Sequence, residues 1–64
     1  MRLTEFWARM ERVFGPSAAD SVARDQVLSG LGNQTVHEAL AAGTETRAVW
    51  LAVVDAFELP AAER

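Results

Sequence analysis

The chain has 64 residues, a formal net charge of −3 and no cysteine, and half of its residues are hydrophobic. This length allows one domain with a single core, and the lack of cysteine excludes disulfides and thiolate metal sites. Such a hydrophobic fraction argues against disorder, and the negative charge opposes binding to phosphate backbones and anionic membranes. We therefore expect one domain over residues 1–64.

No segment of the chain is predicted to enter a membrane or to direct export. The longest apolar run, residues 48–54, is far shorter than the roughly 20 residues of a membrane-spanning helix. Residues 1–5 lack the charged region and the apolar stretch of a signal peptide. We expect a cytoplasmic protein that does not bind membranes.

The first predicted helix covers residues 4–14. Its apolar residues recur at intervals of three and four, which is the spacing of an amphipathic helix with one buried face. Thr4 is the expected N-cap, and Gly15 with Pro16 is expected to end the helix. The apolar face consists of Leu3, Phe6, Trp7, Met10, Val13 and Phe14.

The second predicted helix covers residues 18–28 and is followed by Gly30. Ser17 and Asp20 have the spacing of a capping box at its start. Gln26 lies within its apolar face, and we expect this side chain to hydrogen-bond to the backbone of the next loop. That loop, residues 29–34, is expected to be held in place by Leu31. The apolar face is narrow and consists of Ala19, Val22, Ala23 and Val27.

Two further helices are predicted in the C-terminal half. The third covers residues 36–42, with a capping box of Thr35 and Glu38 before it and Gly43 as a left-handed terminator after it. The fourth begins near residues 44–46 and runs to about residue 58, before Pro60. Its apolar residues spread over an arc of about 240°, much wider than the stripe of a surface helix. This helix therefore either passes through the middle of the bundle or presents apolar surface to a partner.

Together these elements predict an all-α fold, a small bundle of three main helices and one short helix. Residues 36–58 form a pair that resembles a helix-turn-helix motif. We find no internal repeat and no low-complexity segment. The expected core consists of Phe6, Trp7, Met10, Val13, Phe14, Val22, Val27, Leu40, Val49, Val53 and Phe57.

No pattern in the sequence predicts catalysis or metal binding. The single histidine, His37, lies in the first turn of the third helix, where we expect it to be exposed. His37 and Glu38 are adjacent, so they point away from each other on a helix, and no other metal-ligand spacing occurs. We expect a protein that is not an enzyme and that binds no metal and no cofactor.

The pair at residues 36–58 also invites a DNA-binding hypothesis, since two short helices joined at a glycine are typical of that class. The outward positions of its second helix are Arg47, Leu51, Asp55 and Glu58. Only the arginine among them is a residue type that commonly reads bases or contacts phosphates. A small basic edge on the first helix adds Arg2, Arg9 and Arg12. A DNA-associated protein that uses these four arginines is therefore the alternative hypothesis, which the net charge disfavours.

Protein binding is the function that the sequence supports best. Leu51 is the clearest signal, because it is apolar in the polar sector of its helix and has no apparent role in packing its own domain. Trp50 and Val54 are further candidate contacts. Tryptophan in so small a domain belongs to the core more often than to an interface, so the placement of Trp7 and Trp50 stays open. We expect the partner to be another protein or a second copy of the chain.

Several segments of the chain are similar to one known family. They are Met-Arg-Leu-Thr-Glu-Phe-Trp at residues 1–7, Ala-Arg-Asp-Gln-Val-Leu at 23–28, Thr-Val-His-Glu-Ala-Leu at 35–40 with Gly43, Val-Trp at 49–50 and Leu-Pro at 59–60. In these segments the chain resembles DUF3046, a family of short actinobacterial proteins. The resemblance implies a helical, cytoplasmic protein without an assigned activity, and a gene neighbourhood shared with the recombinase of DNA repair and its regulator. Many relatives carry cysteine where this chain has Val54, so a thiol role in them does not extend to this chain.

Overall fold

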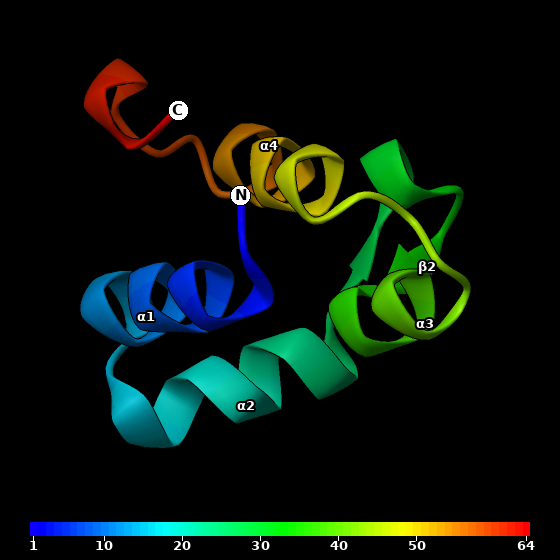
Figure 1. Ribbon diagram of the computed structural model, residues 1–64, viewed down its shortest axis with the longest axis horizontal. Helices are drawn as coiled ribbons and strands as arrows, with labels where there is room; N and C mark the ends of the chain where they lie inside the picture. The colour runs from blue at the N-terminus through cyan, green and yellow to red at the C-terminus, as the bar shows by residue number, and fades with distance from the viewer.

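The computed structural model describes all 64 residues and confirms the predicted fold of three longer helices and one short helix. A two-stranded antiparallel hairpin, which was not predicted, joins the second and third helices (Figure 1). None of the helices has the length and apolar character needed to cross a membrane. The elements in chain order are α1 (Leu3–Phe14), α2 (Pro16–Asp25), β1 (Val27–Leu28), the 3-10 helix η1 (Ser29–Leu31), β2 (Gln34–Thr35), α3 (Val36–Ala41), α4 (Thr46–Ala56) and the 3-10 helix η2 (Ala61–Glu63).

α4 packs against two of the other helices and against the segment that contains the hairpin. α1 and α2 form an antiparallel pair, and α4 packs on α1 on the side away from α2 (Figure 1). α3 packs on both α2 and α4, while the strand β1 and the 3-10 helix η1 also contact α4. Because α1, α3, β1 and η1 all contact α4, several sides of this helix are covered, which accounts for most of its wide apolar arc.

Gly15 and Pro16 separate α1 from α2 as predicted, but the helix starts differ from the prediction. Gly15 has a φ of +88°, and Pro16 occupies the first turn of α2, where its missing N–H leaves no hydrogen bond unmade. Since α2 already begins at Pro16, Ser17 lies inside the first turn, and the predicted capping box of Ser17 with Asp20 is wrong. Thr4 likewise lies inside α1 and is not its N-cap.

α2 ends at Asp25 and not at residue 28, because the next residues pair as a strand. Val27 lies opposite Thr35 in this antiparallel ladder. Successive side chains of a strand point to opposite faces, so Leu28 is buried at 5% exposure while Val27 is 57% exposed. The predicted core position of Val27 is therefore wrong, and Leu28 takes that role. Gln26 is exposed, which also contradicts its predicted place on a buried face.

The connection between the strands is ordered, as predicted for residues 29–34. Gly32 and Asn33 both have a left-handed φ, +65° and +62°, and together they reverse the chain. Leu31 packs against the core. A Cβ atom placed on Gly30 would lie 3.4 Å from the Cβ of Ala52, so the connection runs directly over α4.

The start of α3 is capped as predicted. The backbone N–H of Glu38 donates to Oγ1 of Thr35 over 3.1 Å, and the N–H of Thr35 donates to Oε1 of Glu38 over 2.8 Å. Gly43 follows α3 with a φ of +89°, in agreement with its predicted role. α4 ends at Ala56, slightly earlier than predicted, and Glu58 beyond it has a left-handed φ of +52°.

The core differs from the prediction mainly in its centre. Its largest fully buried side chain is Trp50, which was not assigned to it. The expected core residues that are fully buried are Phe6, Met10, Val49 and Val53. Half-buried against them lie Trp7, Val13, Phe14, Val22, Leu40 and Phe57. Buried hydrophobic residues outside the expected core are Ala19, Ala23, Leu28, Val36, Ala39, Trp50 and Val54.

Candidate interaction surface

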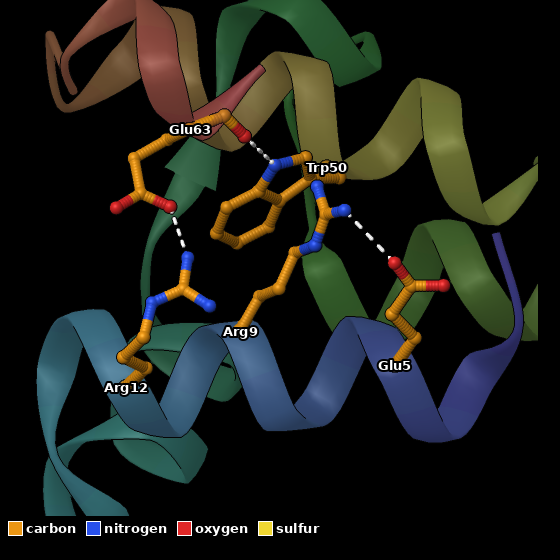
Figure 2. Close-up of polar contacts among 5 residues, drawn as sticks. All are labelled: Glu5, Arg9, Arg12, Trp50 and Glu63. Carbon is orange, nitrogen blue, oxygen red and sulfur yellow. Dashed lines mark hydrogen bonds and ion pairs between the residues drawn. The ribbon is translucent and has the colours of Figure 1, made fainter.

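Trp50 lies between α4 and α1 and has no solvent exposure (Figure 2). The ring of Phe6 meets it edge-on, with 5.9 Å between the ring centroids. The guanidinium carbon of Arg9 lies 5.8 Å from the centroid of the Trp50 ring, within the range of a cation–π contact. The indole Nε1–H donates a hydrogen bond of 2.6 Å to the backbone carbonyl of Glu63. A buried donor needs such a partner, so Trp50 depends on the C-terminal end of the chain.

Residues 59–64 form a segment that we call the C-terminal strap, and it connects α4 to α1. The carboxylate of Glu63 forms an ion pair with Arg12 of α1, while its carbonyl accepts the hydrogen bond from Trp50 (Figure 2). Arg64 forms an ion pair of 2.7 Å with Asp55 of α4. Within the strap only Leu59 and Glu63 are half-buried, and the other residues are exposed. Leu59 packs against the core, and the rest of the strap is held largely by polar contacts.

The structure separates the three residues predicted to contact a partner. Trp50 and Val54 belong to the core, so in this conformation neither side chain can contact a partner directly. Leu51 is only half-buried and does not pack against the core cluster. It shares one side of α4 with Arg47, Ala48 and Asp55, which are all exposed. We call these four residues the α4 outer face.

The predicted basic edge is largely occupied by contacts within the chain. Arg9 forms an ion pair of 2.8 Å with Glu5, in addition to its contact with the Trp50 ring, and Arg12 pairs with Glu63 of the strap (Figure 2). Arg2 and Arg47 are exposed and take part in no ion pair. The four arginines therefore do not form one free basic patch.

His37 is exposed, as predicted, and connects two helices. Its Nε2 atom lies 3.2 Å from Oδ1 of Asp20 on α2, and its ring centroid lies 5.3 Å from that of Trp7. Asp20 also forms an ion pair of 2.7 Å with Arg24. The structure contains no pocket and no group of three or more acidic, histidine or cysteine side chains that could hold a metal ion.

The C-terminal strap is the feature that sequence reasoning missed. Pro60 marks the end of α4 in the sequence, but nothing in the spacing of residues indicates which way the chain continues. The pairing of Arg12 with Glu63 joins residues at opposite ends of the chain, and no periodic pattern connects them. The available signal was Trp50, since a buried indole N–H has to find an acceptor.

These features define a class of small helical domain, with a central fourth helix and a C-terminal segment that covers a core tryptophan. The chain belongs to the family described as "Protein of unknown function (DUF3046)", whose family model matches residues 1–62. This finding confirms the resemblance seen in the sequence. No curated protein and no solved structure is detectably similar to the chain.

Proposed function

We propose that the chain is a non-enzymatic protein-interaction module that binds its partner through the α4 outer face. The observation that carries this proposal is the placement of Leu51, a large apolar side chain at the surface that the core does not use. A half-exposed leucine is common by itself, so its neighbours also matter. Ala48 beside it is small and exposed, which lets another molecule approach the helix closely.

The charges around Leu51 also suit a protein partner. Arg47 and Asp55 have opposite signs and lie one helical turn before and after Leu51. Their formal charges cancel, so the face itself carries no net charge, and Asp55 also pairs with Arg64 of the strap. An apolar centre with balanced charges at its rim is typical of the surfaces through which proteins associate.

The test is co-purification from the native cell with the tagged wild-type chain and with Leu51→Asp. Leu51→Asp is expected to keep the fold and to lose the partner, because a carboxylate at the centre of an apolar interface would be buried without a counter-charge. Leu3→Asp is the matched control, since Leu3 is 51% exposed and lies on α1. Static light scattering of the same three proteins tests for self-association. Equal association of the wild-type and Leu51→Asp proteins would refute the proposal.

DNA binding is the second candidate, and the arrangement of α3 and α4 around Gly43 is the observation that favours it. Only Arg47 lies on the second helix of that pair without an ion-pair partner, whereas Arg9 and Arg12 are engaged within the chain. We expect titration with duplex DNA to show no salt-sensitive binding at low ionic strength. Binding that weakens steeply as salt is raised would favour this candidate over protein binding.

A further inference from the structure

We propose that the C-terminal strap covers a second binding surface, which takes a short acidic peptide of a partner protein when the strap lifts. This surface is made of Trp50 on α4 and of Arg9 and Arg12 on α1 (Figure 2). It is distinct from the α4 outer face and does not require that face to bind a partner.

The strap is held in a way that allows it to open while the domain stays folded. Leu59 packs against the core and stays in place, whereas the side chains at positions 60, 61, 62 and 64 are exposed, so lifting residues 60–64 would uncover little apolar surface of their own. Its two ion pairs, Arg12 with Glu63 and Arg64 with Asp55, lie at the surface, where such pairs contribute little. Glu58, just before the strap, has a left-handed φ of +52°, which is unfavourable for a residue with a side chain. Segments held like this open locally more readily than the core.

The surface under the strap has the composition of a binding site. Lifting the strap would leave the indole N–H of Trp50 without its acceptor and Arg12 without its carboxylate. Tryptophan and arginine are the residues most often found at the energetic centres of interfaces. Arg9 is held against the indole ring by Glu5, so part of this surface is ordered whether or not the strap is present.

The strap itself shows which occupant fits. One residue, Glu63, supplies both the carbonyl for Trp50 and the carboxylate for Arg12. Pro60 precedes it by three residues and fixes part of the backbone that presents these two groups. A partner peptide with a glutamate in a short turn after a proline would make the same contacts. The positive charge of Arg12 selects an acidic peptide over a neutral or basic one.

The opening of the strap is measurable in the full-length chain by NMR, as solvent exchange of the Trp50 indole Nε1–H. Glu63→Arg places two cations together, and we expect exchange of this proton to become about tenfold faster. The double variant Arg12→Glu/Glu63→Arg restores an ion pair of opposite polarity and is expected to return exchange toward the wild-type rate. The indole signal of Trp7 reports in each sample that the domain is folded. Equal exchange rates in all three proteins would overturn the proposal.

Peptide binding is tested by titrating a peptide with the sequence of residues 59–64 into the Glu63→Arg chain. We expect the Trp50 indole signal to move back toward its wild-type position, and a peptide with glutamine in place of the glutamate to bind several-fold more weakly. The double variant, which lacks the cation at position 12, is expected not to bind the peptide. No shift at millimolar peptide, or equal binding of both peptides, would overturn the proposal. A shift of the Trp50 indole signal that grows with protein concentration in the absence of peptide would also overturn the proposal. The occupant of the surface would then be a second copy of the chain.

The proposal for the α4 outer face and the proposal for the surface under the strap can be refuted independently of each other. Leu51→Asp changes the α4 outer face and leaves Trp50, Arg9 and Arg12 intact. Loss of the co-purified partner in that variant and loss of peptide binding in the strap experiment are therefore independent results.

Discussion

Replacement of Trp50 tests the central role of this residue in the fold. We expect Trp50→Ala to destabilise the domain severely, because the side chain has no solvent exposure. Burying about 200 Å² of aromatic surface at about 25 cal/mol per Å² contributes about 5 kcal/mol, and measured losses for comparable truncations are about 3–5 kcal/mol. At about 0.05–0.15 kcal/mol per residue, a domain of this size has a total stability of about 3–10 kcal/mol. The alanine variant therefore loses from about a third of this stability to all of it, and it unfolds if the total lies in the lower half of the range.

Trp50→Phe separates packing from hydrogen bonding at the same position. Phenylalanine keeps an aromatic ring against Phe6 but loses the hydrogen bond to the carbonyl of Glu63, a loss of about 1 kcal/mol. With the smaller ring included, we expect the free energy of unfolding to fall by about 2 kcal/mol. Urea denaturation followed by far-UV circular dichroism measures both variants. Trp7→Phe is the matched control and is expected to have a smaller effect, because Trp7 is half-buried and its indole makes no hydrogen bond within the chain.

Two results would refute this reasoning. One is a cooperative unfolding transition in Trp50→Ala with a free energy of unfolding lowered by less than about 1 kcal/mol, since truncation of a fully buried tryptophan is expected to lower it by about 3–5 kcal/mol. The other is an equal loss in Trp7→Phe and Trp50→Phe, because the hydrogen bond to the strap would then have no measurable role.

The same urea assay tests three local features of the fold. Leu28→Ala is expected to destabilise the domain by about 2–4 kcal/mol and Val27→Ala by less than about 0.5 kcal/mol; the reverse order would show that the strand register is wrong. Thr35→Ala removes one half of the capping box of α3 and is expected to lower stability by about 1 kcal/mol, whereas an unchanged midpoint would show that the cap is dispensable. Gly43→Ala places a side chain at a φ of +89° with free space around it, so backbone strain alone is expected to lower stability by about 1 kcal/mol, and any stabilisation would contradict this.

The features that could be predicted from the sequence depend on neighbouring residues. The existence and type of all four helices follow from apolar spacing that repeats within a few turns. The capping box of Thr35 and Glu38 and the terminator Gly43 act within one turn of the helix they cap. In each case the interaction that decides the structure lies only a few residues away along the chain, so the sequence pattern contains it.

The end of α2 shows where this reasoning fails. Residues 26–28 fit a helix by spacing alone, but the ladder between Val27 and Thr35 joins two segments separated by a turn. In a strand, successive side chains point to opposite faces, whereas in a helix side chains return to the same face every 3.6 residues. The strand pairing therefore buries Leu28 and exposes Val27. Short apolar runs are ambiguous between helix and strand until their partner is known.

The sequence alone determined the helical class, the order of the helices, their main caps and the family of this chain. It also marked Leu51 as an apolar residue outside the core pattern, and the structure leaves that side chain half-exposed and off the core cluster. Only the tertiary structure decided that Trp50 and Val54 are buried, and that Glu63 returns to Trp50 and Arg12. The burial of a residue depends on every element that packs around it, and the contacts of the strap join distant parts of the chain. The local spacing of residues therefore predicts neither the burial of Trp50 nor the contacts of Glu63.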